Sequence, residues 1–180
     1  NAGIDESIAR FRPVLERATE DGVRVRGYVS TVLGCPYQGE VPVADVVRVA
    51  KRLHTLGCYE ISLGDTIGVG TPQKARAMLK AVAAEVPMPA LAIHFHDTYG
   101  QALANILACL EEGVAVVDAA VGGTGGCSYA EGGRGNGGEG GHRGRLYEEA
   151  RPYVTCEAYR GLADSCVTSR HEQAVSAANL

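Results

Sequence analysis

Strand-like and helix-like segments alternate along the first two thirds of the chain. Apolar and β-branched residues predict four strands, over residues 23–31, 58–65, 90–97 and 114–121. Apolar residues at helical spacing predict one helix before the first strand and one between each consecutive pair, over residues 5–22, 43–56, 71–86 and 99–112. Strands that are joined by helices pair in parallel through right-handed crossovers. The pattern therefore predicts an α/β fold, and both a closed eight-stranded barrel and an open doubly wound sheet satisfy it.

Local signals predict where several of these helices begin and end. Asp5 is expected to cap the first helix, and Thr71 followed by Pro72 has the chemistry of an N-cap and a first helical residue. Gly57 and Gly113 follow the second and fourth helices, where a glycine commonly adopts the left-handed conformation that ends a helix.

Composition argues against several classes of protein. The net charge of −4 comes from mixed charges, so we expect no nucleic-acid partner. No apolar run approaches the roughly 18 to 20 residues that span a bilayer, so we expect no membrane partner. The six cysteines include no C-x-x-C pair, which disfavours a structural zinc site and favours a reducing compartment.

Two histidines lie one residue apart in the segment LAIHFHDTYG, residues 91–100. Successive side chains of a strand point to opposite faces, so His94 and His96 are expected to point the same way and Phe95 the other. Two imidazoles that converge in this way form half of a divalent-metal site. They could equally be two hydrogen-bonded polar side chains at the end of a strand, and the pattern alone leaves both interpretations open.

Two further residues could carry chemistry. Asp65 begins a glycine-rich turn, and it could cap that turn or present a carboxylate beside the histidines. Cys127 lies among glycines in GGTGGCSYAEGG, which suits a loop that closes over a ligand. Its thiol could act as a proton donor, a proton acceptor or a nucleophile. The alternative is a flexible linker with an incidental cysteine.

Four segments resemble the motifs of 3-hydroxy-3-methylglutaryl-CoA (HMG-CoA) lyases, in the same order along the chain. They are VRGYVSTVLGCPYQGEV, GCYEISLGDTIGVGTP, HFHDTYGQALAN and GGTGGCSYAEG, and the resemblance covers about residues 5–136. Isopropylmalate and homocitrate synthases and hydroxy-oxo-acid aldolases belong to the same superfamily and also carry H-x-H on a barrel strand. DTYGQALAN together with the cysteine-bearing glycine loop favours the lyase.

The resemblance implies a TIM (β/α)8 barrel, of which residues 1–136 form about the second half as four βα units. It implies one Mg²⁺ or Mn²⁺ held by His94, His96 and Asn136, and catalytic roles for Cys127, Asp65 and His94. The implied reaction cleaves HMG-CoA, an acyl-CoA partner, to acetyl-CoA and acetoacetate, as in leucine degradation and ketone-body formation. A homodimer in the bacterial cytoplasm or the mitochondrial matrix is expected for the full-length protein. A related aldolase or acyl-CoA-condensing synthase is the alternative.

Two regions depart from the family's pattern. The first four barrel strands, with an arginine-aspartate pair that supplies a further metal ligand, have no counterpart, so we expect a fragment with unpaired strand edges. We expect such a fragment to be inactive alone. After Asn136 the segment GGEGGHRGRLYEEA replaces an amphipathic helix, so residues 137–180 are predicted to be an irregular tail, either divergent or read out of frame.

Overall fold

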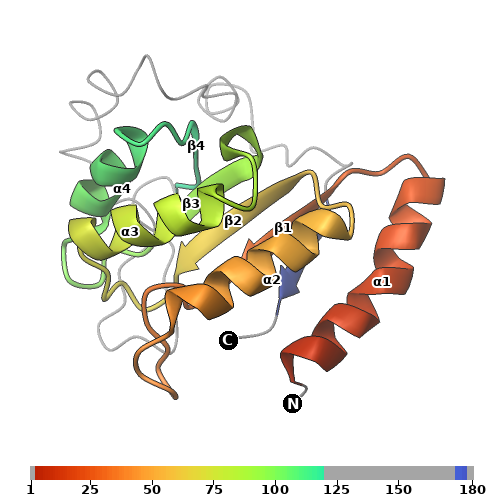
Figure 1. Cartoon of the computed structure of the whole chain (residues 1–180), viewed down its shortest axis with the longest axis horizontal. Helices are drawn as coiled ribbons and strands as arrows, with labels where there is room; N and C mark the ends of the chain where they lie inside the picture. The colour runs from red at the N-terminus through yellow and green to blue at the C-terminus, as the bar shows by residue number, and fades with distance from the viewer. Residues whose placement is uncertain (1–2, 120–172, 178–180) are drawn as a thin grey trace, which may run out of the picture.

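The computed structural model describes residues 3–119 and 173–177. Its elements are α1 (Ile4–Glu20), β1 (Val25–Val29), α2 (Val43–Thr55), β2 (Glu60–Asp65), α3 (Pro72–Ala83), the short 3-10 helix η1 (Met88–Ala90), β3 (Leu91–Phe95), α4 (Ala102–Leu110), β4 (Val116–Val117) and β5 (Gln173–Ala177). The strands pair in parallel in the order β4-β3-β2-β1-β5 (Figure 1). The predicted alternation of strands and helices is confirmed. Within the described ranges, no helix is both long enough and apolar enough to cross a bilayer.

The two faces of the sheet differ in chemistry, because successive strand residues point to opposite sides. One face carries buried apolar side chains, namely Val25, Val29, Ile61, Leu63, Leu91, Ile93 and Phe95. These side chains form one core with apolar residues of α2, α3 and α4, and α2 and α3 lie across the same side of the sheet (Figure 1). The opposite face carries Arg26, Tyr28, Ser62 and His94. Helices gathered on one face of a parallel sheet correspond to the outer ring of a TIM barrel, so the described residues form part of such a barrel.

The helix ends follow the predicted signals with one exception. Thr71 caps α3, where its hydroxyl oxygen accepts a hydrogen bond from the Lys74 amide at 3.4 Å. The prediction that Asp5 caps α1 is wrong, because the N-cap is Gly3 and Asp5 lies inside the first turn. A carboxylate is favourable there because the N-terminus of a helix is positive, and Asp5 also pairs with Arg52 of α2.

Within the predicted tail of residues 137–180, Gln173–Ala177 form the short strand β5. This strand pairs in parallel with β1, from Val25 beside Gln173 to Val29 beside Ala177. The physical reason is that an unpaired strand edge presents unsatisfied N–H and C=O groups, which a further strand satisfies. β5 therefore covers the edge of β1, and within the described residues the sheet ends on β4 and β5. The predicted boundary at residue 136 and the other residues of the tail lie outside the described residues.

The buried thiols of Cys58 and Cys109 are expected to react slowly in the folded chain. Burial raises the pKa of Cys58 to about 11 and that of Cys109 to about 12, from an ordinary value of 9.0. The thiolate is the reactive form of a cysteine. At pH 8 the fraction of each thiol that is thiolate is therefore at least about a hundredfold lower in the folded chain than at the ordinary pKa. We expect iodoacetamide to modify both residues at least about a hundredfold more slowly in the native chain than in urea. Peptide mass spectrometry checks this, and equal rates in the two states would contradict the burial.

Candidate metal centre

The imidazoles of His94 and His96 converge at the carboxyl end of β3, where His94 is a strand residue and His96 follows the last one. Their Nε2 atoms lie 3.3 Å apart, as the two-residue strand period predicts. Two ligand atoms on adjacent corners of an octahedron with bonds of about 2.1 Å lie about 3 Å apart. This spacing fits a divalent cation held by both nitrogen atoms, and it also fits a hydrogen bond between the two rings.

The second ring nitrogen of His94 contacts Asp118, a residue that the sequence analysis did not select. The distance from His94 Nδ1 to Asp118 Oδ2 is 3.1 Å. A carboxylate only accepts hydrogen bonds, so Nδ1 carries a proton, and in the neutral imidazole the Nε2 lone pair faces His96. Metal-binding histidines almost always donate their other N–H to a carboxylate, a carbonyl or a water in this way. The contacts therefore fit a metal centre.

Asp118 is held by residues of two other strands. Arg26 of β1 contacts both carboxylate oxygens, with Nη2 at 2.9 Å from Oδ1 and Nη1 at 3.0 Å from Oδ2. Ser62 of β2 donates its hydroxyl to Oδ2 at 3.0 Å. The guanidinium of Arg26 also donates to Glu60 at 2.5 Å, and these two side chains are only 11% and 12% exposed. We call Arg26, Glu60, Ser62, His94 and Asp118 the inner-face network.

The charge states in this region suit a cation. Burial alone would raise the pKa of Asp118, but hydrogen bonds from His94 and Arg26 and the charge of Arg26 lower it below its ordinary value. Burial, and then the neighbouring His94, lowers the pKa of His96. At neutral pH the Asp118 carboxylate is therefore charged, and the His96 imidazole is neutral and able to act as a ligand.

The structure directs the Asp65 carboxylate away from the two imidazoles. The pairing of β2 with β3 places Gly64 beside His94 and Asp65 beside Phe95, so the Asp65 carboxylate leaves the sheet on the helix-covered face. It is fully buried, and it accepts hydrogen bonds from the amides of Val69 at 3.2 Å and Gly70 at 2.8 Å. Burial raises its pKa, and these amides oppose that rise. The contacts are those of a turn cap, and the catalytic role of Asp65 stays a prediction.

The loops after β1 and β2 are joined by a hydrogen bond, and the second of these loops is also bonded to the main chain of His96. Thr31 is buried and has a φ of +58°, which is unusual for a β-branched residue, and its amide donates to the Thr66 hydroxyl at 2.8 Å. The amide of His96 donates to the Asp65 carbonyl at 3.2 Å. The main chain around His96 is thereby tied to the loop that Asp65 caps.

Two predicted site residues, Cys127 and Asn136, lie outside the described residues. Over residues 3–119 and 173–177, no group of three or more His, Cys, Asp or Glu side chains is arranged to hold a metal ion. The role of Asn136 as a third ligand is therefore still a prediction.

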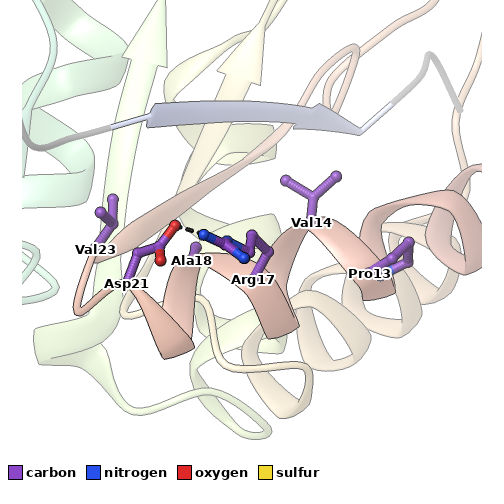
Figure 2. Close-up of a pocket in the computed structure, with 6 residues that line it drawn as sticks. All are labelled: Pro13, Val14, Arg17, Ala18, Asp21 and Val23. Atoms are coloured by element: carbon purple, nitrogen blue, oxygen red, sulfur yellow. Dashed lines mark hydrogen bonds and ion pairs between the residues drawn. The ribbon is translucent and has the colours of Figure 1, made fainter.

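A surface hollow on α1 is separate from the inner-face network. It has a volume of about 390 Å³, and its lining residues are Pro13, Val14, Arg17, Ala18, Asp21 and Val23. Arg17 Nε donates to Asp21 Oδ2 at 2.8 Å, a contact that Figure 2 marks with a dashed line. No predicted site residue lines this hollow, so we assign it no part in the candidate centre.

Comparison with known proteins identifies close relatives. The HMGL-like family model matches residues 1–137. The chain is 60% identical over 136 residues to the mitochondrial hydroxymethylglutaryl-CoA lyase of Bos taurus, a match that covers 76% of this chain and 42% of that protein. It is also 60% identical over 136 residues to the 3-hydroxy-3-isohexenylglutaryl-CoA/hydroxy-methylglutaryl-CoA lyase of Pseudomonas aeruginosa, covering 76% of this chain and 45% of that protein. The crystal structure of hydroxymethylglutaryl-CoA lyase from Pseudomonas aeruginosa matches with a TM-score of 0.79 and 47% identity, over 95% of this chain and 60% of that one.

These matches confirm the resemblance to HMG-CoA lyases that four sequence motifs predicted. They also confirm the barrel, because the described sheet and helices superpose on a solved lyase structure. The chain spans less than half the length of the two relatives from Bos taurus and Pseudomonas aeruginosa. The family model nevertheless matches more than half of the chain, and the chain therefore belongs to the HMGL-like family.

Proposed function

We propose that the protein to which this chain belongs is a metal-dependent lyase that cleaves HMG-CoA to acetyl-CoA and acetoacetate. The observation that carries the proposal is the convergence of His94 Nε2 and His96 Nε2 at 3.3 Å. They lie at the carboxyl end of a parallel strand, which is where TIM-barrel active sites are found. The relatives named as lyases of this substrate support the same reaction.

His94 and His96 would hold the cation, with Asn136 as a third ligand. Imidazole nitrogen and amide oxygen together suit Mg²⁺ or Mn²⁺, with imidazole favouring Mn²⁺. When bound, the cation supplies an electrophile that polarises the oxygen atoms of the substrate and orients them. Asp118 contributes the orientation of the His94 ring, through its contact with Nδ1.

The reaction breaks the bond between C2 and C3 of the HMG group. A base takes the proton of the C3 hydroxyl, whose oxygen becomes the ketone of acetoacetate, and the bonding electrons pass to the acetyl-CoA enolate, which an acid protonates at C2. We assign the hydroxyl proton to His94 with Asp65, and the protonation of C2 to Cys127. This assignment follows the resemblance to the lyases and not the contacts. With a cation on Nε2 and the Nδ1 proton directed at Asp118, His94 has no free lone pair, and the Asp65 carboxylate lies on the other face of the sheet.

The partners and the compartment follow the same proposal. The substrate partner is an acyl-CoA thioester, and the full-length protein is expected to form a homodimer. The relatives include proteins named as mitochondrial in Bos taurus and as cytoplasmic in Danio rerio, and a bacterial protein from Pseudomonas aeruginosa. We accordingly propose the mitochondrial matrix or the bacterial cytoplasm for this protein.

An assay of the protein to which this chain belongs, with HMG-CoA and either Mg²⁺ or Mn²⁺, tests the proposal. Acetyl-CoA and acetoacetate should form in equal amounts, and EDTA or the substitution His96→Ala should abolish them. Condensation of acetyl-CoA with an oxo acid, or cleavage of a hydroxy-oxo acid, would favour the synthase or aldolase alternative. A folded chain that binds Mn²⁺ but converts none of these substrates would be the inactive fragment.

A further inference from the structure

We propose that Asp118 is a positioning residue that holds His94 in the Nδ1–H tautomer, and that Arg26 is the anchor of Asp118. The inference rests on the proposed function only for the identity of the ligand, a divalent cation. The evidence for the tautomer is the geometry of the inner-face network, and the tautomer can be measured with no metal present.

The contacts of the Asp118 carboxylate leave one arrangement of protons. Oδ1 accepts from Arg26 Nη2 at 2.9 Å, and Oδ2 accepts from Arg26 Nη1 at 3.0 Å and from Ser62 at 3.0 Å. Arginine cannot accept a hydrogen bond, and the ionised carboxylate cannot donate one. His94 Nδ1, at 3.1 Å from Oδ2, must therefore be the donor in the neutral imidazole.

Arg26 fixes the plane of this carboxylate and not only its position. Its two terminal nitrogen atoms form a fork with Asp118, while its Nε donates to Glu60 and its Nη1 to the Tyr28 hydroxyl, each at 2.5 Å. The Arg26 side chain is 11% exposed, so these bonds lie in a region of low dielectric, where charge-assisted bonds are strong. The main chain of Asp118 is held as well, because its amide donates to the Ile93 carbonyl at 2.9 Å.

The tautomer decides what His94 offers to a cation. With the proton on Nδ1, the Nε2 lone pair faces Nε2 of His96, 3.3 Å away. With the proton on Nε2, an N–H group would occupy that direction and exclude a cation. Asp118 selects the first state before any ligand binds, so the cost of choosing the tautomer does not reduce the affinity for the cation.

Asp118→Ala and Glu60→Ala form a matched pair of variants. Both carboxylates contact Arg26 on the same face of the sheet, so either substitution leaves Arg26 with one carboxylate partner. Of the two carboxylates, the Asp118 side chain is the one that the structure places at hydrogen-bond distance from a nitrogen of His94. A general loss of order around Arg26 would affect both variants, whereas the loss of tautomer selection would affect Asp118→Ala alone.

The measurement is long-range ¹H–¹⁵N NMR of the histidine rings in the metal-free chain at neutral pH, followed by titration with Mn²⁺ monitored by EPR. We expect the Nδ1–H tautomer of His94 in the unsubstituted chain and in Glu60→Ala, and a shift toward Nε2–H in Asp118→Ala. The Mn²⁺ affinity should fall about 10- to 100-fold in Asp118→Ala and less than about threefold in Glu60→Ala.

Two results would overturn the proposal. One is an Nε2–H tautomer of His94 in the unsubstituted chain, which can be observed even if neither variant folds. The other is a folded Asp118→Ala variant with an unchanged tautomer and an unchanged Mn²⁺ affinity. A tautomer that responds to Asp118 in a chain that binds no Mn²⁺ would support the positioning role and count against the proposed metal centre.

Discussion

Gly68→Ala is expected to destabilise the chain by about 2–5 kcal/mol, and Gly22→Ala by only about 1–2 kcal/mol. Both glycines have a φ of +69°, so the free-energy cost of placing an alanine in this left-handed conformation is the same at either position. A Cβ at Gly22 would meet nothing within 4 Å, whereas at Gly68 it would lie 2.8 Å from the carbonyl oxygen of His96 and 2.8 Å from the Thr98 hydroxyl. The difference between the variants measures the cost of this close approach.

Urea unfolding of the two variants gives both values from the shift in transition midpoint at constant slope. Equal losses of stability would show that the Gly68 loop is not packed against His96. The same contact predicts a functional effect, because the carbonyl of His96 belongs to the main chain and can move only with the residue. Gly68→Ala should weaken the binding of Mn²⁺ in the EPR titration, and Gly22→Ala, on α1's C-terminal turn, should not.

Features that depend on local spacing could be predicted from the sequence. The two-residue period of a strand was enough to place His94 and His96 on one side, and the Thr71-Pro72 pair was enough to begin α3. Each of these features involves residues that are close together in the chain. Their geometry is therefore set by the local backbone conformation.

Features that depend on pairing across strands could not be predicted in the same way. Asp118 contacts His94 because β4 pairs with β3, and Arg26 reaches Asp118 from β1 across the intervening strands. An aspartate within the apolar run VAVVDAAV was the available signal, but its partner depends on the register of the sheet. The direction of Asp65 likewise depended on whether the residue paired with His94 was Gly64 or Asp65 itself.

The register also gives the two sides of β3 separate roles. His94 belongs to the inner-face network, while Phe95 belongs to the apolar core with the helices and is 0% exposed. A substitution on one side should thus change a property that a substitution on the other side leaves intact. The residue between the two histidines provides the most severe test of this separation.

Phe95→Ala should lower the free energy of unfolding by about 3–5 kcal/mol, because it removes a fully buried ring and leaves a cavity in the core. Phe95→Leu, which keeps most of the volume, should cost less than about 1.5 kcal/mol. In the folded leucine variant the tautomer of His94 and the Mn²⁺ affinity should match those of the unsubstituted chain, since Asp118 and Arg26 lie on the opposite face. A leucine variant of near-normal stability that has lost the Nδ1–H tautomer would show that the core and the inner-face network are coupled, and that strand alternation alone does not separate them.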